Sequence, residues 1–483
     1  MSWFMRSQCS EFVKYIDKMH KLSYNISKII IKLSYLGGFK MSNNVLVLMV
    51  GTNPLPNYIV GSYLKENYDK FVFIYSEKNE DINQSSTKDY ANKLKKHLNL
   101  DNCTLLPLSN VSNPSAIRDD LKEKFPDNVD EVHLNYTGGT KTMAVHVYNF
   151  LKEKFNDNFN ASYLDARSHK LIYDNSKKES LNLKDKIKID IDTLLSIHLY
   201  KKNKLETHDT YNYKYKQKFG DNFDSISEKI ENAIKDGKGK DFVKWLENPF
   251  RKIFKGNNRL LEQAEKFREH IQKLSDSNPS PIYEFNNKTL PFIWDILNAF
   301  PEDKRINDGE KLWIPGIDIN NKQFSNRIKD TVEFLDGKWL EWYVYNEIRN
   351  ELLNKGLEEE KHFGISLEAK KENSPESPNF ELDIFMINGY QLVGISITTS
   401  DKQGDCKLKG FEVIHRVRQI GGDESKAILI TGLPKDDINR SPKKLQEDLS
   451  FMTGTANDKI VVFGVDDWAD IGNKICGEVF QWH

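Results

Sequence analysis

The sequence has 483 residues and a formal net charge of −1, with 38% hydrophobic and 29% charged residues. This is the composition of a soluble globular protein with two or three domains, and it excludes a global basic field that would attract nucleic acid. The four cysteines form no CxxC pair, which argues against a disulfide framework or a structural zinc site and favours a cytoplasmic protein. The longest apolar runs, such as VLVLMV at 45–50, are too short to cross a membrane.

The first forty residues precede a second methionine, Met41, after which a strand pattern begins at once. Charged residues interrupt this leader throughout, which is not the pattern of a signal peptide. We interpret residues 1–40 as an N-terminal extension, which is either dispensable or a docking helix.

Short apolar strands alternate with helical patterns from residue 41 to residue 175. This alternation predicts an α/β domain, a Rossmann-like doubly wound parallel sheet with right-handed crossovers. In such sheets ligands bind outside the carboxyl ends of the strands. Strands are expected over 44–51, 70–76, 102–109 and 131–137, helices over 56–67, 86–98, 114–125 and 140–155, and a closing hairpin over 160–175.

The remaining chain divides into three parts of different character. A polar, lysine-rich connector is followed by a stretch dominated by helical patterns, and then by a second α/β pattern. The expected parts are a connector over 176–210 with a strand-like segment at 187–200, a helical middle domain over 211–330 with helices at 241–255 and 258–274 and a break at 275–287, and a C-terminal domain over 331–483.

A glycine turn follows the strand predicted over 131–137. Gly138 and Gly139 permit positive φ and a close approach of a ligand to the backbone. Thr140 and Lys141 then occupy the first turn of the next helix, where free N–H groups and the positive end of the helix dipole favour a phosphate. The spacing is not that of a Walker A loop. The alternative is a structural turn before an ordinary helix.

A second polar loop, GTNPLPN at 51–57, follows the first strand. Two prolines fix its backbone, and Thr52, Asn53 and Asn57 offer small polar groups. In a doubly wound sheet this loop and the glycine turn can converge over one edge. Together they indicate a site for a polar ligand that carries ribose and phosphate.

The stretches VGTNPLPNYIV, LNYTGGTKTMA and ASYLDARSHKL resemble the CARF domain of CRISPR-associated accessory effectors over about 41–175. This resemblance implies a homodimer that binds a cyclic oligoadenylate across its two-fold axis, with cyclic tetra-adenylate as the expected ligand. The ligand contacts that it implies are Thr52, Asn53, Asn57, Ser76, Gly138, Gly139, Thr140 and Lys141.

The C-terminal domain combines acidic residues with a helix and a hairpin. The helix predicted over 334–356 carries Glu341 beside its buried stripe, and Asp383 lies on the first of two strands joined at Asn388-Gly389. A further helix is expected over 407–422. Two carboxylates in such a setting are the elements of a Mg²⁺ or Mn²⁺ site, whose bound water can attack a phosphodiester.

The stretches GKWLEWYVY, FELDIF, LVGISIT and RQIGGDESKAILI resemble the PD-(D/E)XK nuclease fold, which is fused to CARF domains in one branch of these effectors. The family's second strand ends in an acidic residue or serine, a spacer and then lysine. Here these positions hold Ser396, Ile397 and Thr398, so the lysine is absent. Either Lys407 or Lys409 supplies the cation, or the domain has lost catalysis.

The combined expectation is a cytoplasmic, homodimeric antiviral effector that cyclic oligoadenylate activates as a Mg²⁺- or Mn²⁺-dependent endonuclease on DNA or RNA. The alternative is a sensor of the same ligand whose degenerate nuclease domain binds nucleic acid or a protein partner. The residues expected to act in catalysis are Glu341, Asp383, Ser396, Lys407, Lys409 and Glu412, of which Glu341, Asp383 and Glu412 would hold the metal.

Overall fold

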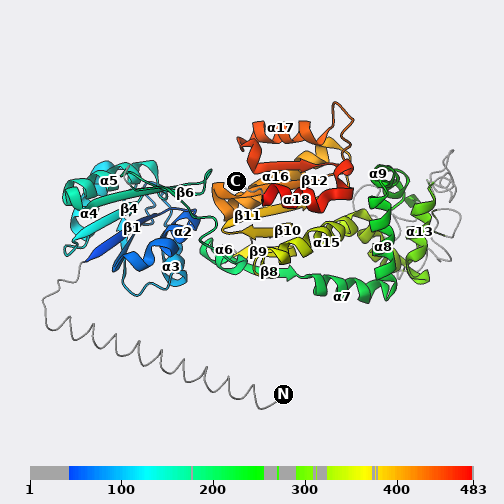
Figure 1. Ribbon diagram of the computed structural model, residues 1–483, viewed down its shortest axis with the longest axis horizontal. Coiled ribbons are helices and arrows are strands. Elements are labelled where there is room, and N and C mark those ends of the chain that lie inside the picture. The colour runs from blue at the N-terminus through cyan, green and yellow to red at the C-terminus, as the bar shows by residue number, and fades with distance from the viewer. Residues whose placement is uncertain are drawn as a thin grey trace, which may run out of the picture.

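The computed structural model describes residues 43–175, 178–254, 290–307, 324–372 and 379–480, with a few isolated positions between them. Figure 1 shows two α/β units side by side along the long axis, with a helical group at the far end. Three predictions lie outside the described residues: the extension over 1–40, most of the helix over 258–274 and the break over 275–287.

The N-terminal unit is built on a seven-stranded sheet with the strand order β3-β2-β1-β4-β5-β6-β7. The first five strands in chain order run parallel, and the last two are antiparallel additions. This confirms the predicted doubly wound fold with its closing hairpin. The strands are β1 Asn44–Val50, β2 Lys70–Ser76, β3 Cys103–Leu108, β4 Glu131–Asn135, β5 Phe159–Asp165, β6 Lys170–Tyr173 and β7 Leu181–Asn182.

Helices cover both faces of this sheet, as the central strand requires. Val45, Val47 and Met49 of β1 point into one hydrophobic cluster, and Leu46 and Leu48 point into another. A strand that is apolar at every position must be covered on both sides. The helices are α4 Pro114–Lys124 and α5 Lys141–Phe155 on one face, and α2 Leu55–Leu64 and α3 Lys88–His97 on the other (Figure 1).

The C-terminal unit contains a six-stranded mixed sheet in the order β13-β12-β11-β10-β9-β8. The strands β8 to β11 pair antiparallel, whereas β11, β12 and β13 pair in parallel. The predicted hairpin at Asn388-Gly389 is confirmed, and Gly389 has the positive φ of 65° that this tight turn needs. The strands are β8 Tyr200–Glu206, β9 Phe363–Lys371, β10 Phe380–Asn388, β11 Gln391–Ile397, β12 Lys426–Ile430 and β13 Ile460–Phe463.

Long helices pack on the two faces of the second sheet. Val344 and Ile348 of α15 share a cluster with Ile384 of β10, whereas Val413 and Val417 of α16 belong to the cluster on the other face. The helices predicted over 334–356 and 407–422 are thus confirmed, with the second ending at Gly421 and capped by Gly422. The helices of this unit are α15 Trp339–Asn354, α16 Gln403–Gly421, α17 Pro442–Thr453 and α18 Ile471–Val479.

The strand-like segment predicted over 187–200 is wrong. Residues Ile191–Ile197 form helix α6, and Asp190 caps it by accepting a hydrogen bond from the Thr193 amide at 2.6 Å. The alternating isoleucines before the cap imitate a strand, but the buried Leu194 and Leu195 follow helical spacing. The predicted connector also supplies β8, which joins the second sheet as its edge strand.

The middle of the chain is helical, as predicted, but it shares its core with the C-terminal sheet. Tyr211, Phe223 and Phe242 lie in the same hydrophobic cluster as Trp339 and Ile384. The segment is therefore packed against the second unit and has no separate core of its own among the described residues. Its helices are α7 His208–Phe219, α8 Asn222–Lys235, α9 Gly239–Trp245, α10 Arg251–Phe254, α13 Pro291–Ala299 and α14 Phe324–Glu333.

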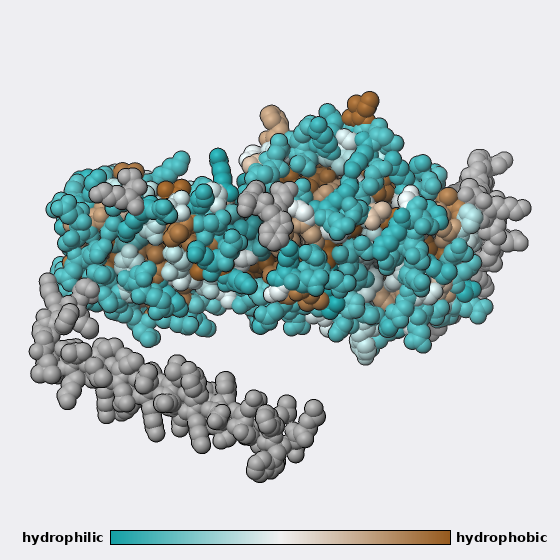
Figure 2. Space-filling view, in the orientation of Figure 1, coloured by the Kyte–Doolittle hydropathy of each residue, from teal (hydrophilic) through white to brown (hydrophobic). Residues whose placement is uncertain are grey.

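The two units are joined by a continuous core. Leu171 of β6 and Ile191 of α6 lie in one cluster with Leu48 of β1 and Leu392 of β11. Hydrophilic residues cover most of the face seen in Figure 2. Within the described part of the chain, no helix has both the length and the apolar character needed to cross a membrane.

Candidate functional site

The first candidate site lies at the carboxyl ends of β1 and β4, where the order of winding reverses. These two strands pair in parallel although β2 and β3 come between them in the sequence. Such a switch point leaves a crevice between the loops that follow the two strands. A Cβ built on Gly51, after β1, would lie 3.1 Å from the amide nitrogen of Gly139, after β4. The predicted convergence of the two loops is therefore confirmed.

Both glycines of the turn are required by its geometry. A Cβ at Gly138 would lie only 2.1 Å from the carbonyl oxygen of Met49, so any side chain there would collide with β1. Gly139 has a φ of +76°, in the left-handed region that other residues rarely adopt. The turn therefore brings its backbone against β1 while Gly139 stays exposed to solvent.

The helix α5 begins directly after this turn. Thr140 caps it, because its Oγ1 accepts a hydrogen bond from the Met143 amide at 3.2 Å. Lys141, the first helical residue, is exposed and forms no hydrogen bond or ion pair with any described residue. A free ammonium group beside the positive end of a helix dipole is a favourable environment for an anion.

The crevice contains a cavity of about 340 Å³. Four of the predicted ligand residues line it: Thr52, Ser76, Gly139 and Thr140. Sequence reasoning missed the segment 82–85, which also lines the cavity and is held by a hydrogen bond from Ser76 Oγ to the Ser85 carbonyl at 2.8 Å. The available signal was the polar run NQSS at 83–86, in the loop between β2 and α3.

The two predicted asparagines do not line this cavity. Asn57 is fully buried, and its Nδ2 donates a hydrogen bond to the Met49 carbonyl at 3.0 Å, beneath Gly138. Asn53 faces the junction with the second unit, where its Oδ1 lies 3.3 Å from Nε2 of His198. Asn57 therefore supports the glycine turn and Asn53 contacts α6, while Gly138 and Lys141 flank the cavity.

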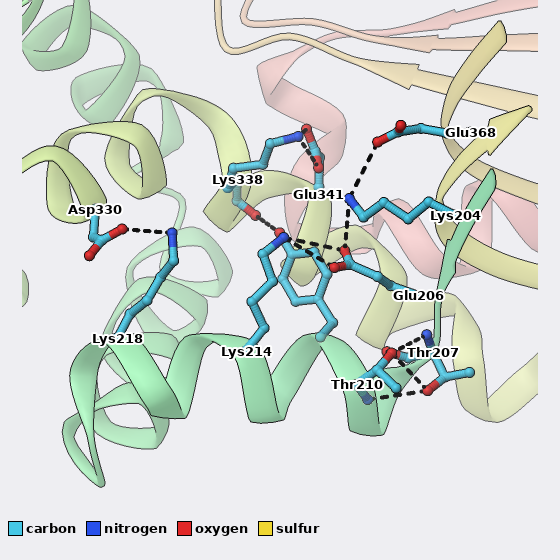
Figure 3. A network of polar contacts seen from close by, with 11 residues as sticks. Lys204, Glu206, Thr207, Thr210, Lys214, Lys218, Asp330, Lys338, Glu341 and Glu368 are labelled. Atoms are coloured by element: carbon cyan, nitrogen blue, oxygen red, sulfur yellow. Dashed lines mark hydrogen bonds and ion pairs between the residues drawn. The ribbon is translucent and has the colours of Figure 1, made fainter. Parts of the chain in front are cut away.

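The second candidate site gathers around Glu341 at the start of α15. This carboxylate is 7% exposed, and Lys338 Nζ donates hydrogen bonds to its two oxygens at 2.7 and 2.8 Å. Figure 3 shows the Lys338 side chain extended toward the Glu341 carboxylate. Asp383 lies on β10, where its Oδ2 accepts hydrogen bonds from Ser396 Oγ at 3.1 Å and from the Ile397 amide at 2.8 Å.

The two carboxylates and the lysine influence one another electrostatically. Burial, and then the charge of Asp383, raise the pKa of Glu341 to about 7, although Lys338 opposes this rise. Burial acts to lower the pKa of Lys338, but the charge and hydrogen bonds of Glu341 and the charge of Asp383 outweigh it, so that this pKa is raised. Lys338 is therefore charged at neutral pH beside both acids.

The predicted replacements for the missing lysine are engaged in ion pairs, although the charge of Lys409 still acts on Glu341 and opposes the rise of its pKa. Lys407 pairs with Asp448 at 2.9 Å, and Lys409 pairs with Glu412 at 3.4 Å along α16. Glu412 is exposed, so the expected third carboxylate does not join Glu341. No group of three or more histidine, cysteine, aspartate or glutamate side chains in the described residues is arranged to hold a metal ion. The predicted three-carboxylate ligand set is therefore not assembled.

Sequence reasoning missed Lys338, although it lies three residues before Glu341 at a helix start, where side chains three apart are neighbours. Its position is held from α7, because the Tyr211 hydroxyl donates to the Lys338 carbonyl at 3.1 Å. Tyr211 in turn stacks on Trp342, with ring centroids 5.1 Å apart. Trp342 and Trp339 are buried in the core, as predicted.

A chain of alternating charges extends from this site along β8 (Figure 3). The buried Glu206 forms ion pairs with Lys214 at 3.2 Å and with Lys204 at 3.7 Å. Lys204 also forms an ion pair with Glu368 at 3.5 Å. The pKa of Tyr211 is raised mainly by burial and then by the charge of Glu341. The charge of Glu206 makes a smaller contribution in the same direction. These ion pairs join the edge strand of the second sheet to α7, and Tyr211 of α7 is hydrogen-bonded to the Lys338 carbonyl before α15.

Comparison with known proteins identifies the first unit. Residues 45–192 match the family model of the Card1 CARF domain. The N-terminal unit is a CARF domain. The match covers the Rossmann-like sheet and both loops of the first candidate site, and it extends through the start of α6.

Two solved structures share the fold of nearly the whole chain. Protein VC1899 from Vibrio cholerae is 14% identical, with a TM-score of 0.52 over 90% of this chain and 98% of its own. Can2 from Sulfobacillus thermosulfidooxidans, solved in complex with cyclic tetra-adenylate, is 15% identical, with a TM-score of 0.51 over 91% of this chain and 99% of its own. The similarity therefore extends past the CARF domain into the second unit. No curated protein matches the sequence.

Proposed function

We propose that this chain is a CRISPR-linked effector in which a cyclic oligoadenylate binds the CARF domain and controls a metal-dependent nuclease site in the second unit. The observation that carries the proposal is the crevice between β1 and β4, where Gly139, Thr140 and the unpaired Lys141 offer backbone amides and a cation. Support also comes from the CARF match and from the fold shared with Can2, which was solved with cyclic tetra-adenylate.

The proposed ligand is cyclic tetra-adenylate, and the active form is a homodimer. A cavity of about 340 Å³ is small for a whole tetranucleotide, so each copy would hold part of the ring. A ring with two-fold symmetry suits two copies of the same crevice. Ligand binding activates only if it favours one arrangement of the dimer over another.

Glu341 and Asp383 fit a Mg²⁺ or Mn²⁺ ion as a two-carboxylate pair. Their mutual repulsion contributes to the raised pKa of Glu341, and a divalent cation held between them would remove that repulsion. When bound, such an ion supplies a polarised water for attack on a phosphodiester and offsets the charge that develops there. The remaining ligands would be water molecules and backbone carbonyls, as is common for hard cations.

Lys338 has the role that the family pattern gives to the absent lysine after β11. Its ammonium lies beside both acids and is charged at neutral pH, so it can offset negative charge on a scissile phosphate. Ser396 fixes the orientation of Asp383 through its hydroxyl. Lys407 is paired with Asp448 of α17, and Lys409, which is paired with Glu412, acts on Glu341 more weakly than Lys338 does.

Cleavage assays with purified protein test the proposal. Wild-type protein with cyclic tetra-adenylate and Mn²⁺ is expected to cut supercoiled or single-stranded DNA or RNA, and Asp383→Ala to lower the rate about 100-fold or more. Glu381→Ala is the matched control, because this exposed glutamate lies two residues earlier on the same strand. If no substrate is cut, or if Asp383→Ala cuts as fast as Glu381→Ala, the nuclease assignment is wrong.

A second candidate function is a sensor whose C-terminal unit docks nucleic acid or a protein without cleaving. Two observations favour it: Thr398 occupies the lysine position, and the described residues contain no cluster of three metal ligands. The same assays distinguish the two, because this candidate predicts binding of cyclic tetra-adenylate with no cleavage at any metal concentration.

A further inference from the structure

A second cavity, of about 410 Å³, lies at the junction between the CARF domain and the second unit. We call it the junction cavity. One wall comes from the turn between β5 and β6 and from the residues after β7, and the other comes from the starts of β11 and β12, the residues before β13 and the end of α18. It shares no lining residue with the crevice at the glycine turn.

The junction cavity is lined mainly by positive charge. Five basic side chains line it and only two acidic ones, Asp458 and Glu478. The basic side chains come from both units, which makes the charge a property of the interface. They are Arg167, Lys170 and Lys184 from the N-terminal side, and Lys426 and Lys459 from the second unit.

Two of these lysines take only neutral partners. Lys184 Nζ donates to Gln391 Oε1 at 2.7 Å, and Lys459 Nζ donates to backbone carbonyls at 3.3 and 3.4 Å, one of them in the β5–β6 turn. Neither forms an ion pair with a described residue. Lys426 is 8% exposed and is paired with Glu478 at 2.8 Å. The cavity therefore has lysine ammonium groups that lack carboxylate partners.

This arrangement carries an electrostatic penalty in the unliganded protein. Burial, and then the charge of Lys459, lower the pKa of Lys184 to about 8, with Lys426 adding to the effect and Asp185 opposing it. Burial likewise lowers the pKa of Lys459, with Lys426 adding to the effect and Asp458, Glu424 and Asp165 opposing it. Neighbouring like charges that burial already disfavours form an electrostatically perturbed cluster, which is a candidate site for an anion.

We propose that the junction cavity binds a phosphate-bearing anion, which bridges the CARF domain and the second unit. Its volume lies in the range of small-molecule sites and is large enough for a nucleotide. Phosphate oxygens suit it because several ammonium and guanidinium donors converge from two sides. The phosphate belongs either to a free nucleotide or polyphosphate, or to a phosphodiester of a cyclic oligonucleotide. Binding there would hold the two units together.

Calorimetric titration of the full chain tests this proposal with inorganic tripolyphosphate, ATP and cyclic tetra-adenylate as separate probes, in metal-free buffer. The test variant combines Lys184→Gln with Lys459→Gln. The control combines Lys186→Gln with Lys188→Gln, two exposed lysines from the same segment. Wild type and control should bind one of these probes, more weakly at higher salt, and the test variant should bind it about tenfold more weakly or not at all.

The probe that responds identifies the source of the phosphate. Loss of tripolyphosphate or ATP binding in the test variant indicates a free polyphosphate, and loss confined to cyclic tetra-adenylate indicates its phosphodiesters. The unliganded test variant should also melt no lower than the control, because it has lost the repulsion between the lysines. If no probe distinguishes the test variant from the control, or if the test variant only melts at a lower temperature, the lysines are structural and the proposal is wrong.

Discussion

Replacing Glu341 with glutamine tests whether the second site is held under electrostatic strain. In the folded protein, burial and then the charge of Asp383 raise the pKa of Glu341 from its usual 4.5 to about 7. The folded state therefore keeps a proton that the unfolded chain has released. The contribution of this proton to the free energy of unfolding is fully present below pH 4.5 and is lost as the pH rises through 7. At 1.36 kcal/mol for each pH unit, this difference corresponds to about 3 kcal/mol lost by pH 8.

Glutamine has the shape of glutamate, stays neutral and still offers an oxygen to Lys338. At pH 5 the variant and the wild type should therefore differ in stability by less than about 1 kcal/mol. At pH 8 the variant should be more stable by about 1–3 kcal/mol, the lower values allowing for the weaker bond to Lys338. For a unit of this size, that is a rise in melting temperature of several degrees, at about 2–4 °C for each kcal/mol.

Differential scanning calorimetry at both pH values, in metal-free buffer, measures this difference. The matched control is Glu351→Gln, a half-exposed glutamate on the same helix whose surface pair with Lys355 contributes little, so it should melt as the wild type does at each pH. The reasoning is refuted if Glu341→Gln melts lower than the wild type at pH 8, or if the difference between them is the same at both pH values.

Three further predictions follow from the two sites. Lys141→Ala should weaken binding of cyclic tetra-adenylate about tenfold in calorimetry without changing the melting temperature, because Lys141 is exposed and unpaired; equal affinity would contradict this. Gly138→Ala should lower the melting temperature by several degrees, because its Cβ would lie 2.1 Å from a carbonyl oxygen of β1; an unchanged melting curve would contradict the geometry. Lys338→Gln should lower the cleavage rate about 100-fold, whereas Lys407→Gln, which removes only the ion pair with Asp448, should leave it unchanged; the reverse order would contradict the role given to Lys338.

The fold of the CARF domain was predictable because its strands are apolar at every position and its turns carry glycine. The pattern at 44–50 identifies a strand buried on both faces, and the glycines at 138 and 139 mark the turn that follows β4. The segment at 187–200 was misread because its isoleucines alternate with charged residues, which is the period of a strand. The cap at Asp190 outweighs that alternation.

The candidate site residues were predictable only where the position of a loop at the end of a strand determines what its residues contact. Thr52 and Thr140 line the cavity because loops at the carboxyl ends of parallel strands must meet. Asn57 stays a prediction as a ligand contact, because a polar residue in such a loop can equally well turn inward and hold a carbonyl, as it does at Met49. Lys338 was missed because the family's spacing predicts a lysine directly after β11, whereas here the ammonium beside Glu341 comes from the residue before α15.

The most direct test of the account is the rate of nucleic-acid cleavage, measured with Mn²⁺ as the concentration of cyclic tetra-adenylate is raised. Cleavage should rise from a low basal rate to saturation, and Lys141→Ala should reach the same maximum only at about tenfold higher ligand concentration. Cleavage that does not depend on the ligand, or a Lys141→Ala curve that coincides with that of the wild type, would contradict control through the crevice at the glycine turn.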